Sequence, residues 1–135
     1  MTSPSIAADP RSAPARRALE WTARAMRGDI LQPGTRGGFF AGAATDNRTV
    51  APGQLFFALP GERADGFDFA GAAVAAGATG VVIARGRGAP AGCADAAVIA
   101  VDDPRRALGD LARAARAEFR GLVIAVTGSN GKTTT

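Results

Sequence analysis

The stretch LFFALPGERADGFDFAGAAVAAGATGVVIA, residues 55–84, decides the fold. It opens and closes on continuous apolar runs, residues 55–59 and 80–84, which are typical of strands buried on both faces. Between them, residues 70–77 are small and mostly apolar and stop at Gly77, as expected of a short helix and its end. Strand, helix and strand in this order predict an α/β domain.

Apolar runs on either side of this unit predict further strands. Residues 97–101, AVIAV, form a run of the same kind, and residues 30–32, ILQ, form a short one. Residues 38–50 begin apolar and become polar at Asp46, while residues 123–126, VIAV, form the last run. We therefore expect a small mixed or parallel sheet with helices packed on it.

Two amphipathic segments predict helices that cover this sheet. Asp103 followed by Pro104 is a strong helix start, because Asp caps free N–H groups and Pro lacks one. The apolar stripe that follows has helical spacing and consists of Leu108, Leu111, Ala112, Ala115 and Phe119. A shorter helix is predicted from Pro14 to Met26, ended by Gly28. Its apolar face consists of Leu19, Ala23 and Met26.

The composition indicates a folded protein without a nucleic-acid partner. Hydrophobic residues make up 47% and charged residues 21% of the chain, as in globular domains. The net charge of +4 comes from scattered arginines rather than a dense basic run, which favours a solvated basic surface. Cys93 is the only cysteine and there is no histidine, which excludes an internal disulfide and makes a zinc site implausible.

Nothing in the sequence indicates a membrane protein. No apolar run approaches the roughly 20 residues of a membrane span, and the polar first residues contain no apolar signal region. Residues 1–13 are rich in Ser, Ala and Pro and are predicted to be a disordered leader. We expect a cytoplasmic monomer.

The stretch VIAVTGSNGKTTT, residues 123–135, has the context of a phosphate-binding loop. An apolar strand leads directly into glycines that let backbone N–H groups approach an anion beside the positive end of a helix. Lys132 would reach the β- and γ-phosphates of ATP, and the Thr133 hydroxyl would ligate Mg²⁺. The predicted ATP-binding residues are Gly128, Ser129, Asn130, Gly131, Lys132, Thr133 and Thr134, of which Lys132 and Thr133 are the catalytic candidates.

The lysine strengthens this interpretation, while the spacing weakens it. Lys132 is the only lysine among 16 basic residues, and a compact ammonium fits between phosphates where a planar guanidinium does not. The spacing G-x-x-G-K-T is shorter than the common G-x-x-x-x-G-K-[ST]. A surface turn rich in Gly, Ser and Thr is the alternative.

Two stretches resemble the Mur ligases, the ATP-dependent enzymes that add amino acids to the UDP-muramoyl precursor of bacterial peptidoglycan. TGSNGKTTT resembles their ATP loop, and TDNRTVAPGQLFFALPGERADGFDF, residues 45–69, resembles the signature of their N-terminal domain. The resemblance implies an N-terminal, UDP-substrate-binding domain at residues 14–120. Residues 121–135 would then be the first strand and phosphate loop of a central P-loop ATPase domain that continues beyond Thr135.

Within the family, GER-x-DG-x-DF is most similar to the members that add D-alanyl-D-alanine to UDP-N-acetylmuramoyl-tripeptide. The resemblance implies that ATP phosphorylates the terminal carboxylate of the substrate and that the amine of D-alanyl-D-alanine attacks the acyl phosphate. Alternatives are a member that adds an amino acid to the dipeptide precursor, or a non-catalytic nucleotide-sugar-binding module. Because the remaining catalytic groups would lie beyond Thr135, we expect residues 1–135 alone to be inactive.

The same resemblance implies that Asp46, Asn47 and Arg48 line the uridine-diphosphate site. From the residues alone, an Asx-type turn with a solvated arginine remains equally open. The family usually has Ser or Thr where this chain has Asn47, and His where it has Phe67. Asn can still donate and accept hydrogen bonds, but Phe cannot.

Overall fold

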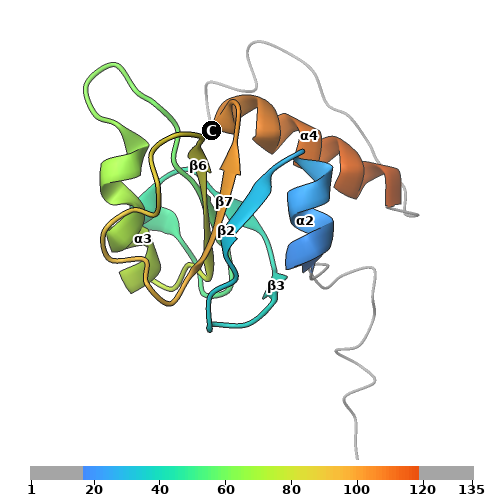
Figure 1. The fold of residues 1–135 in the computed structure, drawn as a ribbon, viewed down its shortest axis with the longest axis horizontal. Coiled ribbons are helices and arrows are strands. Elements are labelled where there is room, and N and C mark those ends of the chain that lie inside the picture. The colour runs from blue at the N-terminus through green and yellow to red at the C-terminus, as the bar shows by residue number, and fades with distance from the viewer. Residues whose placement is uncertain (1–16, 119–135) are drawn as a thin grey trace, which may run out of the picture.

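Five strands form a mixed sheet at the centre of the structure, a computed structural model that describes residues 17–118 (Figure 1). In chain order they are β2 (Asp29–Gln32), β4 (Ala43–Ala44), β5 (Leu55–Phe57), β6 (Gly80–Ala84) and β7 (Ala97–Val101). Their order across the sheet is β2-β7-β6-β5-β4, with β2 antiparallel to β7 and the other neighbours parallel. The predicted small mixed sheet is confirmed.

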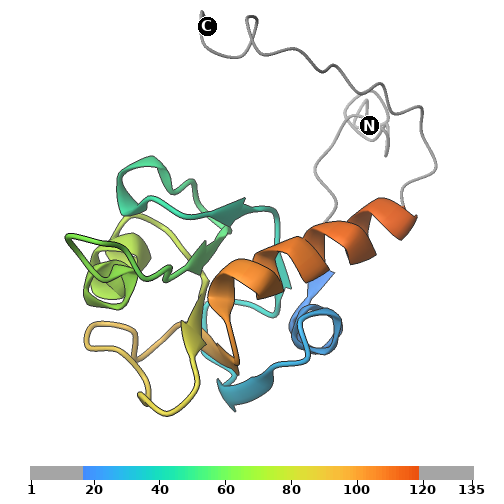
Figure 2. The ribbon, with the colours of Figure 1, turned by 90° about the horizontal axis from the view of Figure 1, so that it is seen from above.

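Helices cover both faces of this sheet, because side chains alternate along each strand. In β6, Val81 and Ile83 enter one core and Val82 enters the other, and all three are fully buried. The first core packs under α3 (Ala70–Ala75), and the second packs under α2 (Leu19–Ala25) and α4 (Pro104–Glu118). Figures 1 and 2 show α3 on one side of the strands and α2 with α4 on the other.

The start of α2 differs from the prediction. Arg17–Ala18 is not helical but forms a short strand, β1, that pairs antiparallel with β3 (Phe39–Phe40). The helix begins at Leu19, because this pairing holds Ala18 in an extended conformation. The predicted apolar face of this helix is confirmed, since Leu19, Ala23 and Met26 are all buried. Pro14 lies outside the described residues.

The end of α2 also corrects the prediction that Gly28 ends the helix. Arg27 takes the left-handed conformation, with φ of 56°, and its N–H donates to the carbonyl of Arg24. The N–H of Gly28 donates to the carbonyl of Ala23 at 2.8 Å, so the two bonds form a Schellman motif with arginine in the usual glycine position. Gly28 instead allows close packing, because a Cβ there would lie 2.6 Å from Cγ2 of Ile99.

The start of α4 is as predicted. The carboxylate of Asp103 accepts a hydrogen bond from the N–H of Arg105 at 3.0 Å, and its carbonyl accepts one from Ala107. Ala107 is buried, and Leu108 and Leu111 pack half-buried against the second core. At the other end, the indole N–H of Trp21 donates to Glu118 at 2.9 Å and ties α2 to the last turn of α4.

One strand and one helix end earlier than predicted. Strand β5 stops at Phe57 rather than at Leu59, and α3 stops at Ala75. There are also two short 3₁₀ helices. The first, η1 (Asn47–Thr49), follows β4, and the second, η2 (Gly66–Phe69), directly precedes α3. The predicted leader and the predicted strand and phosphate loop of residues 121–135 lie outside the described residues.

Candidate functional site

The loops that follow the parallel strands collect at one edge of the sheet, where open α/β sheets bind ligands. A cavity of about 580 Å³ lies there, between the segment after β4 and the loop after β5. It is lined by Thr45, Asp46, Asn47, Arg48, Phe56, Leu59, Ala64, Gly66 and Phe69. The structure thus places all three predicted substrate-binding residues on the wall of one cavity.

Asp46 organises the first wall of this cavity. Its Oδ1 accepts from the backbone N–H of Arg48 at 2.9 Å and from Nε of the same arginine at 3.0 Å. Its Oδ2 accepts from Nη2 of Arg48 at 2.8 Å. The side-chain hydrogen bonds, followed by the backbone one, lower the pKa of Asp46 to about 2. The side-chain hydrogen bonds and the charge of Asp46 raise the pKa of Arg48.

The backbone of this segment therefore has the Asx-type turn that the sequence left open. The turn does not withdraw the arginine from solvent, because the side chain of Arg48 remains 82% exposed. A guanidinium carries five N–H donors, so the pair with Asp46 leaves donors for an incoming anion. The two interpretations of the motif are compatible with one another.

The second wall is the loop between Pro60 and Gly66. Its ends meet, because Pro60 forms a β-bridge with Asp65 and the N–H of Gly66 donates to the carbonyl of Leu59 at 2.9 Å. Only glycine fits at residue 66, since a Cβ there would lie 2.6 Å from the carbonyl oxygen of Leu59. This close approach brings Gly66 and Ala64 to the cavity.

Phe69 is a cavity residue that the sequence reasoning missed. The residue is 41% exposed although its side chain is large and apolar, and it lines the cavity together with Arg48. Phe67, two residues earlier, does not line the cavity and lies beneath the guanidinium of Arg87, 3.8 Å from the ring centroid. The signal in the sequence was two aromatic residues in a polar loop, but the spacing alone did not show which one faces a ligand.

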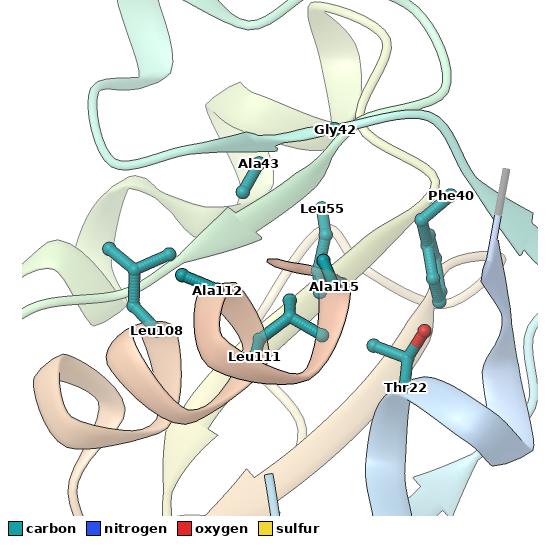
Figure 3. Close-up of a pocket in the computed structure, with 9 residues that line it drawn as sticks. All are labelled: Thr22, Phe40, Gly42, Ala43, Leu55, Leu108, Leu111, Ala112 and Ala115. Carbon is teal, nitrogen blue, oxygen red and sulfur yellow. The ribbon is translucent and has the colours of Figure 1, made fainter. Parts of the chain in front are cut away.

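A second cavity, of about 310 Å³, lies beside α4 and has a different character (Figure 3). Apolar side chains of α4, Leu108 and Leu111 among them, face Phe40 and Leu55 across it. Among the described residues that line it, Thr22 has the one polar side chain, and its hydroxyl already donates to the carbonyl of Ala18 at 2.8 Å. Within residues 17–118, the lining of this cavity offers no free polar side chain that would recognise a phosphate or a sugar.

The predicted ATP and Mg²⁺ residues, Gly128 to Thr134, lie outside the described residues. Within residues 17–118, no group of three or more His, Cys, Asp or Glu side chains could hold a metal ion. No helix described by the structure is long and apolar enough to cross a membrane.

Comparison with known proteins identifies the family of the chain. Residues 40–116, more than half of the chain, match the family model described as "Mur ligase family, catalytic domain". The chain belongs to the Mur ligase family. The resemblance seen in the sequence is confirmed.

Mur ligases of two kinds are similar to the chain. It is 49% identical over 92 residues to the UDP-N-acetylmuramoyl-L-alanyl-D-glutamate–2,6-diaminopimelate ligase of Bradyrhizobium diazoefficiens, covering 68% of the chain and 18% of the relative. It is 41% identical over 120 residues to the UDP-N-acetylmuramoyl-tripeptide–D-alanyl-D-alanine ligase of Bacillus subtilis, covering 89% of the chain and 26% of the relative. The chain therefore spans about a fifth to a quarter of these curated relatives.

A solved Mur ligase has the same fold over most of the described residues. The UDP-N-acetylmuramoylalanyl-D-glutamyl-2,6-diaminopimelate–D-alanyl-D-alanyl ligase of Acinetobacter baumannii matches with a TM-score of 0.59 and 27% identity. The match covers 73% of this chain and 21% of that one. The α/β architecture with helices on a mixed sheet is thus that of a Mur ligase.

Proposed function

We propose that the chain is the N-terminal part of an ATP-dependent ligase of peptidoglycan precursors, and that its cavity holds the UDP end of the substrate. The observation that carries this proposal is the exposed guanidinium of Arg48, aligned by Asp46 on the wall of a cavity of about 580 Å³. That volume lies in the range of cavities that bind small molecules.

The chemistry of the cavity lining suits a nucleoside diphosphate. Arg48 supplies charge-assisted hydrogen bonds for a phosphate, and Asn47 supplies both a donor and an acceptor. The exposed ring of Phe69 gives an apolar surface on which a pyrimidine base can stack, a contact worth about 1–3 kcal/mol in nucleic-acid complexes. Leu59 and Phe56 line the apolar part of the cavity.

We infer that the added group is D-alanyl-D-alanine. Similarity to the Bacillus subtilis ligase that uses D-alanyl-D-alanine extends over 89% of the chain, and the Acinetobacter baumannii neighbour is of the same kind. Addition of an amino acid to the dipeptide precursor is the second candidate. The higher identity of 49% to the diaminopimelate ligase of Bradyrhizobium diazoefficiens favours it, over a shorter stretch of 92 residues.

For the chemical step we propose that residues 128–134 hold ATP. Lys132 would stabilise the charge on the β- and γ-phosphates, and Thr133 would hold the Mg²⁺ that neutralises them. A carboxylate oxygen of the UDP-peptide takes the γ-phosphoryl group and ADP leaves. The amine then attacks the acyl carbon, loses its proton and releases phosphate. The groups that bind this amine lie outside residues 1–135 in the proposal, so the chain by itself is expected to be inactive.

Calorimetric titration of the 135-residue chain with UDP-N-acetylmuramoyl-tripeptide tests the cavity. We expect saturable binding, and Arg48→Ala should weaken it by about tenfold, equivalent to about 1.4 kcal/mol. Arg24→Ala, which removes an exposed arginine of α2 outside both cavities, is the matched control and should leave the affinity unchanged. No saturation at millimolar ligand, about −4 kcal/mol, would count against the site.

A further inference from the structure

Arg87 joins the turn after β6 to the loop that forms the second wall of the cavity. Its Nη1 donates to Oδ2 of Asp65, and Cζ of its guanidinium lies over the ring of Phe67, 3.8 Å from the centroid. Neither partner is close in sequence, so these contacts hold the loop after β5 to the turn after β6. Arg87 itself does not line the cavity.

Asp65 passes this constraint directly to the cavity. It stands between Ala64 and Gly66, both of which line the cavity. Its second oxygen accepts from the N–H of Phe67 at 3.1 Å, so each carboxylate oxygen has a separate partner. The hydrogen bond from Arg87, followed by that from the backbone of Phe67, lowers the pKa of Asp65 and keeps it charged.

Few other contacts hold this wall in place. Residues 61–64 are all exposed, and no fully buried residue lies between Ala58 and Ala70. Leu59 and Phe67 pack only half-buried against the two cores. The loop is closed by the backbone bonds of its two ends and by the contacts of Arg87 with Asp65 and Phe67. Loops with so little burial open locally at low free energy, so a single anchor can decide how well the wall is ordered.

We propose that Arg87 is a positioning residue for the nucleotide cavity. Acting through Asp65 and Phe67, it holds the Ala64–Gly66 wall where the bound nucleotide requires it. The inference rests on the proposed function, since it assigns Arg87 to the same cavity that Arg48 serves by direct contact. The proposal gives the two arginines of this site different roles. Arg48 contacts the ligand, and Arg87 holds the wall of the cavity.

A double-mutant cycle with UDP as the probe tests this assignment. Arg87→Ala and Asp65→Asn should each raise the dissociation constant of the 135-residue chain for UDP by about tenfold. Asp65→Asn keeps an oxygen for the N–H of Phe67 and removes only the charge. If Arg87 acts through Asp65, the double variant should bind no more weakly than Arg87→Ala alone, because Arg87→Ala already removes the ion pair that Asp65→Asn weakens. Arg113→Ala, which breaks an exposed ion pair with Asp110 on α4, is the control.

A second measurement reports the order of the Ala64–Gly66 wall in the absence of ligand. Amide hydrogen exchange at Gly66 and Phe67 should accelerate in Arg87→Ala and stay unchanged in Arg113→Ala, at nearly equal melting temperatures, because the Arg87 pair is partly exposed. Arg87→Lys keeps the charge but not the flat stacking surface, and should restore part of the affinity. This variant also serves if Arg87→Ala proves poorly folded.

Each unexpected result has a distinct meaning. Unchanged UDP affinity in Arg87→Ala, together with weak binding by Arg48→Ala, would overturn the role of Arg87 and leave the proposed function standing. Fully additive losses in the double variant would show that Arg87 and Asp65 affect binding independently of one another, which overturns the positioning role. Failure of the unsubstituted chain to bind UDP would overturn the cavity assignment and this inference with it.

Discussion

Arg48 reaches the candidate nucleotide cavity with its guanidinium already aligned by Asp46. The two side-chain hydrogen bonds restrict a long side chain that would otherwise lose its freedom only when a ligand binds. Prior restriction reduces the entropic cost of binding. The negative charge of Asp46 also partly offsets the positive charge of Arg48. Asp46 therefore orients the guanidinium but weakens its attraction for an anionic ligand.

The shifted pKa of Asp46 can be observed directly. We expect the chemical shift of its carboxyl carbon to change with a midpoint near pH 2 in the unsubstituted chain. Arg48→Ala should return this midpoint toward the ordinary value of 3.8. Because the folded pKa is the lower one, the pair stabilises the fold fully above about pH 4 and loses this effect as the pH falls through about 2. NMR of the labelled side chain measures both midpoints. The same midpoint in both proteins would contradict the observed pairing.

Sequence reasoning found the first wall of the cavity but not the second. Asp46, Asn47 and Arg48 are adjacent in the chain, so a short motif could reveal them. Arg87 lies 22 residues from Asp65, and the two meet only because β6 pairs beside β5 in the sheet. No local pattern encodes such a contact, and the exposure of Phe69 depends on the same packing.

At the scale of single elements, long periodic segments were predictable and two-residue strands were not. The start of α4 follows from Asp103 and Pro104, whose effects act within one turn of helix. The ribbon of β1 and β3 pairs only Arg17 with Phe40 and Ala18 with Phe39, which is too short for any periodicity. It nevertheless decides where α2 begins. Pairing across the chain can therefore override a local helix signal.

Two glycines separate helix propensity from packing. Gly109 lies inside α4, and a methyl group added to its Cα would meet no atom closer than 4.0 Å, so Gly109→Ala should raise the free energy of unfolding by about 1 kcal/mol. Gly28→Ala should lower it by about 1–3 kcal/mol, because its Cβ would overlap Ile99 and Val101. Urea denaturation of both variants measures the difference. A stabilising Gly28→Ala would show that β7 yields more easily than the structure implies.

At the scale of the whole molecule, the order of strands and helices was enough to predict the α/β class. The apolar runs of β5, β6 and β7 carry no polar face, and such strands are stable only with helices on both sides. The strand order and the antiparallel edge strand β2 did not follow from the pattern, since they depend on pairing between distant segments. The proposed phosphate loop stays a prediction, because residues 119–135 lie outside the described chain.

Phe57 and Phe39 compare the core with the surface. Phe57 is fully buried between the sheet and the helices α2 and α4, so Phe57→Ala should cost about 3–5 kcal/mol of unfolding free energy. Phe39 is 55% exposed, and Phe39→Ala should change stability by about 0.5 kcal/mol or less. Thermal and urea unfolding of the pair check this. Equal losses would mean that the second core does not extend across the sheet as described.

The contact between Trp21 and Glu118 gives the molecule an internal optical reporter. Trp21 is the only tryptophan of the chain, and its indole N–H is held by the last turn of α4. Its fluorescence therefore reports on the contact between α2 and the last turn of α4. Emission that shifts to longer wavelength while the circular dichroism stays constant would signal that α4 has lifted from α2 while the sheet remains folded.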